Sequence, residues 1–193
     1  MVGKTLLVFA HADEAAAFAA EGIPHVVTGV GKINATFELT RVLVSALEAG
    51  EPIARVVVLG TAGGVSDGAH LDTVYQIEAA VQHDFSLPSP ELRPAGEMIL
   101  PPERTAVIAT GDAFVKNDAQ RAHIAGLGAS LVDMEAYAYA SVCERFDVPL
   151  QLFKIPSDFA DSSTTDEEWD EIVFRKSEQL REFWDRELTG VPS

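Results

Sequence analysis

Four carboxylates stand at the ends of apolar segments rather than along polar helix faces. They are Glu14, Asp133, Glu135 and Asp158. In an open α/β sheet, side chains at the carboxyl ends of neighbouring strands face one crevice. Carboxylates gathered in a partly apolar crevice acquire separated pKa values, so that one serves as an acid and another as a base near neutral pH. That arrangement suits a cationic transition state, of which glycosidic bond cleavage is an example.

A structural role competes with this interpretation for each acid taken singly. Glu14 and Asp158 also stand where a helix N-cap or a partner of a helix dipole is expected. Their catalytic interpretation therefore depends on all four acids meeting in the fold.

Two glycine-rich segments follow apolar runs, at Gly29-Val30-Gly31-Lys32 and at Gly60-Thr61-Ala62-Gly63-Gly64. Neither satisfies the P-loop or the G-x-G-x-x-G pattern. In the first segment, Ile33 stands where the P-loop requires Ser or Thr, and Asn34 stands where the second pattern requires its third glycine. Each is interpreted either as a tight strand-to-helix turn or as a place where the backbone approaches a ligand closely.

Other catalytic chemistries find little support. The histidines are scattered, with no H-x-x-x-H or H-E-x-x-H pair, so no metal site is expected. Cys143 is the single cysteine, which excludes an internal disulfide, and its apolar helical surroundings predict a core position. The G-x-S-x-G elbow of α/β-hydrolases is missing from the sequence.

The charge balance of 30 Asp and Glu against 14 Lys and Arg argues against nucleic acid or an anionic membrane as partner. No apolar run reaches the roughly 18–20 residues of a transmembrane helix. The N-terminal residues lack the cleavage site of a signal peptide, so a cytoplasmic location is expected. The length of 193 residues is consistent with one domain over residues 1–193.

Apolar runs alternate with helical patterns along the chain, which predicts an α/β fold with a parallel or mixed sheet. The apolar runs cover residues 6–10, 23–30, 55–59, 73–83, 105–110, 131–133 and 150–155, and helices are expected at 13–20, 33–47, 116–126 and 134–146. Prolines between positions 88 and 102 mark an irregular loop. A capping box of Thr165 and Glu168 predicts a last helix with an apolar stripe from Trp169 to Leu188.

With these motifs in this order, the sequence resembles the nucleoside phosphorylase/nucleosidase superfamily, and within it the 5′-methylthioadenosine/S-adenosylhomocysteine nucleosidases. The segments that carry the resemblance are residues 10–14, 29–35, 60–64, 110–115, 132–135 and 157–161. The resemblance implies a single three-layer domain with a central mixed, twisted sheet flanked by helices. It also implies a purine nucleoside as the small-molecule partner, no cofactor, and a homodimer.

The resemblance further implies catalytic roles for three acids. Glu14 would activate the attacking water, and Glu135 would hold the 2′- and 3′-hydroxyls of the ribose. Asp158, supported by Ser157, would protonate N7 of the purine and so make the base a leaving group.

The remaining implied roles concern substrate binding. Met134 would pack against the ribose, and Thr61 would lie near the water and the ribose, with Ala62 and Gly63 beside it. Phe114 would stack on the purine, and the backbone of Val115 would read the edge of the base.

Two departures from the family pattern involve charge. Asp133 stands where the family usually has Glu, and Lys154 stands where it usually has Arg, so we expect these two side chains to pair beneath the water site. The arginines that bind phosphate in the phosphorylases are also missing, since Asp13 and Glu14 occupy the first loop and Leu59 precedes the second glycine segment. A carboxylate there would repel phosphate, which favours water as the nucleophile.

The 5′ end of the substrate is less well defined by the sequence than the purine end. Only residues 21–28 fill a gap where family members usually carry a hairpin, and the proline-rich loop at 86–102 is brief, so the chain is expected to be a shortened member. Alternative functions are a futalosine hydrolase, a phosphorylase that recruits Arg41 or an arginine of a partner subunit, and a non-catalytic nucleoside-binding protein.

Overall fold

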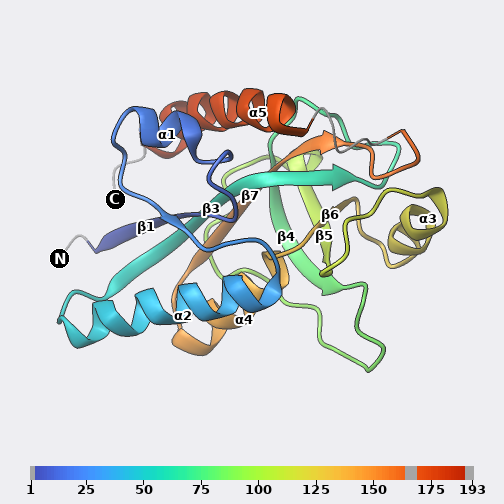
Figure 1. Cartoon of the computed structure of the whole chain (residues 1–193). Coiled ribbons are helices and arrows are strands. Elements are labelled where there is room, and N and C mark those ends of the chain that lie inside the picture. Colours follow the sequence, from blue (N-terminus) through green and yellow to red (C-terminus); the bar gives the residue numbers. More distant parts are fainter. Residues whose placement is uncertain (1–2, 164–168, 190–193) are drawn as a thin grey trace.

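The computed structural model describes residues 3–163 and 169–189, which form three layers (Figure 1). The strands are β1 (Lys4–Phe9), β2 (Val26–Val27), β3 (Ile53–Gly64), β4 (Tyr75–Gln82), β5 (Thr105–Thr110), β6 (Leu131–Asp133) and β7 (Leu150–Asp158). The helices are α1 (Ala16–Ala20), α2 (Lys32–Glu48), α3 (Asp118–Gly126), α4 (Ala136–Phe146) and α5 (Trp169–Phe183), with a 3-10 turn η1 (Pro102–Arg104) and a π-helical turn η2 (Trp184–Leu188). Helices α1 and α5 cover one face of the sheet, and α2 and α4 cover the other.

The sheet is mixed, as predicted, and part of it closes on itself. The strand order is β2-β1-β3-β6-β5-β4-β7, and β7 also pairs with β3. The closure depends on the length of β3, which has 12 residues. The first half of β3 pairs with β1 and its second half with β6, while β7 pairs with both halves of β3. The pairs β3–β6 and β4–β7 are antiparallel, and the others are parallel.

The second glycine segment is a strand, so the turn predicted at Gly60–Gly64 is wrong. These residues complete β3, where Gly60 pairs with Lys154 and Thr61 with Ile155 of β7. Pairing on both sides keeps the backbone extended although glycine is permissive. The first glycine segment is a true turn, since Gly29 and Gly31 have φ of 88° and 94° just before α2 begins.

Several element boundaries differ from the prediction. Helix α4 begins at Ala136 rather than Met134, and β7 continues beyond residue 155 to Asp158. Of the second apolar run, only Val26–Val27 pairs as a strand. The proline-containing segment is irregular as expected, apart from one bridge between Ala80 and Leu92 and the turn η1.

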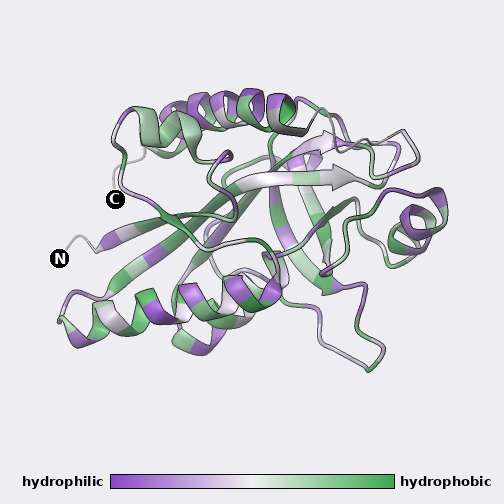
Figure 2. Ribbon diagram, viewed as in Figure 1, coloured by the Kyte–Doolittle hydropathy of each residue, from purple (hydrophilic) through white to green (hydrophobic). Residues whose placement is uncertain are grey.

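Apolar side chains fill the space on both faces of the sheet. Figure 2 shows the apolar residues concentrated in the strands, with polar residues on the outer side of α5. Val173, Leu180 and Phe183 of α5 are buried, which confirms part of the predicted stripe, whereas the capping box of Thr165 and Glu168 lies outside the described residues. No helix in the described part of the chain has the length and apolar character needed to cross a membrane.

The short helix α1 depends on tertiary packing, because five residues are too few for a stable isolated helix. Phe18 anchors it: the side chain is fully buried, and its ring lies 4.8 Å from that of Phe9 and 6.3 Å from that of Trp184. This anchor fixes the chain immediately after Glu14.

We therefore predict that Phe18→Ala lowers the free energy of unfolding by about 3–5 kcal/mol, through lost burial and a cavity. The control is Phe174→Ala on α5, where the side chain is 52% exposed and the expected change is within about 0.5 kcal/mol. Urea-induced unfolding measures both variants. Equal effects of the two substitutions would contradict the prediction.

Candidate active site

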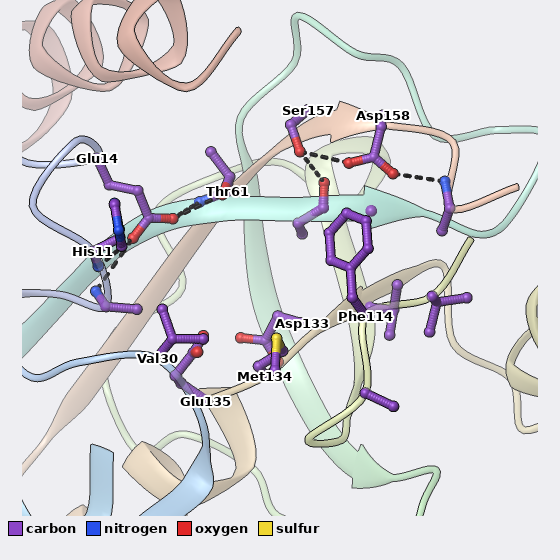
Figure 3. A pocket seen from close by; sticks show the side chains of 17 residues that line it. His11, Glu14, Val30, Thr61, Phe114, Asp133, Met134, Glu135, Ser157 and Asp158 are labelled. Carbon is purple, nitrogen blue, oxygen red and sulfur yellow. Dashed lines mark hydrogen bonds between the residues drawn. The ribbon is translucent and has the colours of Figure 1, made fainter. Parts of the chain in front are cut away.

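A cavity opens where β1, β6 and β7 end beside the glycine segment of β3 (Figure 3). It encloses about 610 Å³ including its open mouth. Every residue predicted for the site lines this cavity except Lys154, which is buried against the lining residue Asp133. The prediction that Glu14, Asp133, Glu135 and Asp158 meet is confirmed.

Glu14 is held by hydrogen bonds to both carboxylate oxygens. Its Oε2 accepts from the backbone N–H of Ala10 at 3.2 Å and of His11 at 3.0 Å. Its Oε1 accepts from both the backbone N–H and the hydroxyl of Thr61, each at 2.7 Å. These bonds replace the N-cap role considered from the sequence, since Ala15 occupies the N-cap of α1. A carboxylate has about four acceptor positions, so these donors satisfy it fully.

A buried ion pair lies behind Glu14. Lys154 Nζ is 2.9 Å from Asp133 Oδ2, and both side chains are almost completely buried, so the predicted pairing is confirmed. Burial by itself lowers the pKa of Lys154, but the carboxylates of Asp133, Glu135 and Glu14 outweigh it and raise that pKa above its usual range. Gly60 makes room for the cluster, because a Cβ there would lie 3.1 Å from both Glu14 Oε1 and Lys154 Nζ.

Asp133 also fixes the start of the following helix. Its Oδ1 accepts from the Thr110 hydroxyl at 2.7 Å, and its Oδ2 accepts from the backbone N–H of Ala136 at 2.9 Å. The Thr110 hydroxyl in turn accepts from the N–H of Tyr137 at 3.0 Å. The end of β5 and the first turn of α4 are therefore tied to the same carboxylate.

Glu135 reaches across to the first glycine turn instead of capping its own helix. Its Oε1 accepts from the backbone N–H of Gly31 at 2.8 Å. Burial and the nearby negative charge of Asp133 raise the pKa of Glu135 to about 8, against the opposing effect of Lys154. Glu135 is thus the acid of the cavity whose charged form is costly at neutral pH.

Asp158 occupies the other end of the cavity, near Phe114 (Figure 3). Ser157 Oγ lies 2.8 Å from Asp158 Oδ2 and 3.3 Å from the carbonyl oxygen of Ala62, and it can donate its proton to either. Asp158 Oδ1 accepts from the N–H of Ala160 at 2.8 Å. When Asp158 carries a proton, it can donate to Ser157 while Ser157 donates to Ala62, so both charge states are satisfied.

The remaining walls are mostly apolar. Phe114 is 41% exposed, which leaves part of its ring available for stacking, and Met134 lies between Asp133 and Glu135. Val115 lines the cavity although it is 4% exposed.

Some lining residues were missed by the sequence analysis, among them His11, Val30 and Ala160. His11 and Val30 lie inside two of the motif segments, but no pattern indicated that they face the cavity. Ala160 lies inside a third motif segment, two residues after the end of β7, and its φ of 50° was not predicted. Within residues 3–163 and 169–189, no three histidine, cysteine or acidic side chains are grouped to hold a metal ion.

Comparison with known proteins agrees with the motifs. The family model of the phosphorylase superfamily matches residues 95–186. 5′-Methylthioadenosine/S-adenosylhomocysteine nucleosidases of Bacillus cytotoxicus and Anoxybacillus flavithermus are each 28% identical, over 69% of this chain and 66% of the relative. The matched part thus spans just under two thirds of these curated relatives. The resemblance to the superfamily is confirmed.

Solved structures confirm the fold class. Futalosine hydrolase of Helicobacter pylori matches with a TM-score of 0.82 at 20% identity, covering 99% of both chains. The 5′-methylthioadenosine/S-adenosylhomocysteine nucleosidase of Helicobacter pylori matches with a TM-score of 0.76 at 20% identity, covering 96% of this chain and 99% of that one. S-adenosylhomocysteine nucleosidase of Streptococcus pyogenes matches with a TM-score of 0.81 at 16% identity, covering 100% and 99%.

The raised pKa of Glu135 predicts an unusual pH dependence of stability. Because its pKa is about 8 when folded, above the ordinary 4.5, the folded chain binds this proton more tightly than the unfolded chain. This contribution to stability is present at low pH and is lost as pH rises through that window. The Glu135→Gln variant has no carboxyl group to ionise at this position, so it escapes this loss. The free energy of unfolding of the variant minus that of the wild type should therefore be larger at pH 8 than at pH 5, by more than about 1.4 kcal/mol.

Urea-induced unfolding at the two pH values measures this difference. Glu144→Gln is the control, since Glu144 is exposed on α4. A difference that stays constant between the two pH values would show that Glu135 titrates normally.

The Lys154–Asp133 pair yields a second prediction. Lys154→Met leaves the Asp133 charge buried without its ionic partner, and the expected loss in free energy of unfolding is about 3–5 kcal/mol. Lys4→Met on the exposed start of β1 is the matched control, with an expected change within about 0.5 kcal/mol. If chemical denaturation gives the same free energy of unfolding for both variants, the Lys154–Asp133 pair does not stabilise the fold.

Proposed function

We propose that this chain hydrolyses the N-glycosidic bond of purine nucleosides of the 5′-thioadenosine type and releases adenine. The observation that carries the proposal is the placement of acids at both ends of one cavity. Glu14 and Glu135 lie beside Lys154 and Asp133 at one end, and Asp158 lies with Ser157 at the other (Figure 3). The resemblance to nucleosidases supports this choice among reactions that use paired acids.

The proposed chemistry begins at the purine end. Asp158, in its protonated state, donates to N7 of the purine, so that the leaving base does not accumulate negative charge. The bond to the ribose then breaks as the sugar develops oxocarbenium character. Positioned acid catalysis of this kind supplies about 10²–10⁴-fold in rate. Phe114 stacks on the base, and the edge of the base contacts the backbone of Val115.

At the sugar end, Glu14 takes a proton from the attacking water. Three of its donors are backbone N–H groups, which cannot turn away, whereas the fourth is the Thr61 hydroxyl. Rotation of that hydroxyl frees an acceptor position on Glu14 Oε1 for the water. Glu135 binds the 2′- and 3′-hydroxyls of the ribose, and Met134 packs against the ring.

Water is favoured over phosphate as nucleophile by the charges in this part of the cavity. The donors that surround Glu14 would suit an oxyanion, but the carboxylate of the chain itself occupies them. Lys154 is neutralised by Asp133. Among the described residues that line the cavity there is no lysine or arginine, so an incoming phosphate would meet a fixed negative charge.

A homodimer in the cytoplasm is part of the same proposal. Helix α2 carries large apolar side chains that are exposed, with Ile33, Phe37 and Leu47 exposed by 80%, 67% and 56%. Their exposure supports a covering partner, and the resemblance to the nucleosidase family favours a second copy of the chain and a cytoplasmic location.

The direct test is release of adenine from 5′-methylthioadenosine, with and without inorganic phosphate. We expect release without phosphate, with free methylthioribose as the sugar product by chromatography. S-adenosylhomocysteine and futalosine assayed in parallel define the accepted 5′-group. Release that depends on phosphate would overturn hydrolysis. If none of the three nucleosides is cleaved, the proposed activity is wrong.

Asp158→Asn tests the acid directly. An amide has no proton to transfer at this step, so kcat should fall by at least about 10²-fold while nucleoside affinity changes little. Calorimetry gives the affinity, and Asp67→Asn, with a fully exposed side chain outside the cavity, is the control. Loss of nucleoside binding with Asp158→Asn would instead indicate a binding role for Asp158.

A further inference from the structure

The C-terminal helix α5 contacts the segment that carries Glu14 through one buried hydroxyl. Ser177 is 0% exposed. Its Oγ accepts a hydrogen bond from the backbone N–H of Ala17 at 3.0 Å and donates to the carbonyl oxygen of Glu14 at 2.7 Å. The contact joins residues 163 positions apart in the sequence.

The Ser177 hydroxyl is inserted into a turn of the backbone. On either side, the chain closes its own turns by bonds from Ala16 N to Asp13 O at 3.3 Å and from Phe18 N to Ala15 O at 3.0 Å. Between them, the N–H of Ala17 and the carbonyl of Glu14 are bridged by the hydroxyl. The backbone at Glu14 is therefore fixed by α5.

Glu14 is thus held at two ends. Its carboxylate is fixed by Ala10 and His11 just after β1 and by Thr61 of β3, and its carbonyl is fixed by Ser177. With both ends anchored, the carboxylate has little freedom to shift relative to a bound substrate. Displacements of about 1 Å at a reacting group can cost about 10²-fold in rate.

Packing and positioning are separable functions of α5. Val173 lies one turn before Ser177 on the same side of the helix and is fully buried, so it contributes to packing without a side-chain polar group. Removing the Ser177 hydroxyl leaves the part-buried N–H of Ala17 and the buried carbonyl of Glu14 without this partner, which favours a local rearrangement of the turn.

We propose that Ser177 is a positioning residue for Glu14, acting through the backbone of the turn at residues 14–17. The inference rests on the proposed function, because it assigns to Ser177 the placement of the group that activates water. Its effect is on the rate of the chemical step rather than on the affinity for nucleoside.

Three variants separate the hydroxyl from packing. Ser177→Ala loses the hydroxyl with little change in volume, and kcat should fall by about 10- to 100-fold while KM stays within about threefold. Ser177→Thr keeps the hydroxyl but adds a buried methyl group, so it should lower the melting temperature and retain kcat within about threefold. Val173→Ala should also lower the melting temperature and retain kcat.

The proposal is supported if kcat falls in Ser177→Ala, which lacks the hydroxyl, and is retained in Ser177→Thr and Val173→Ala despite their lower melting temperatures. An unchanged kcat in Ser177→Ala would overturn it. Equal losses of kcat in Ser177→Ala and Val173→Ala would also overturn it, since loosened packing would then account for both.

Hydrogen–deuterium exchange provides a measurement that does not depend on catalysis. Ser177→Ala should speed exchange in a peptide covering residues 12–18, with exchange in α2 unchanged, and Val173→Ala should not reproduce this local pattern. If the wild type cleaves no nucleoside, the proposed function fails, and the exchange result alone decides whether Ser177 fixes the turn. Unchanged exchange at residues 12–18 would overturn that role.

Discussion

The arrangement of acids in the cavity depends on the buried ammonium group of Lys154. Its side chain is 1% exposed, and the carboxylates of Asp133, Glu135 and Glu14 all act on it. Three acids brought together without a cation would repel one another at short range in a medium of low dielectric constant. One positive charge lowers that repulsion but does not remove it, and burial together with the remaining repulsion from Asp133 raises the pKa of Glu135. The strand register meets this requirement by placing Gly60 of β3 directly beside Lys154 of β7, with room for Glu14 above the glycine.

The four acids differ in their surroundings although their chemistry is the same. Backbone and hydroxyl donors surround Glu14, an ion pair fixes Asp133, and Glu135 receives one backbone N–H in a buried position. Asp158 lies next to a hydroxyl that serves either of its charge states. Separation of environments is the physical means by which identical side chains acquire different protonation at one pH. The proposed division into base, sugar-binding and acid residues is the one that the family resemblance implies, and the different surroundings of the four acids allow it.

Local features of the fold were predictable from the sequence, whereas features that depend on distant pairing were not. Alternating apolar runs and helical patterns identified most elements, because period and composition are local properties. The pairing of Asp133 with Lys154 was also predictable, since two departures from one family pattern have complementary charges. The extended conformation of Gly60–Gly64 was missed because its cause is pairing with β7 and β6, which has no local signal. The closure of the sheet and the contact of Ser177 with the turn at Glu14 were missed for the same reason.

Rigidity and chemistry impose opposite demands on Glu14. A carboxylate that stabilises a developing cation should be fixed in advance, so that no reorganisation accompanies the reaction. A carboxylate that accepts a proton needs a vacant acceptor position, yet the resting contacts of Glu14 fill all of them. The structure reconciles the two demands by making three donors backbone N–H groups and the fourth a hydroxyl on a rotatable bond. The fixed donors hold the group in place, and the Thr61 hydroxyl is the contact that can be exchanged for water without moving the chain.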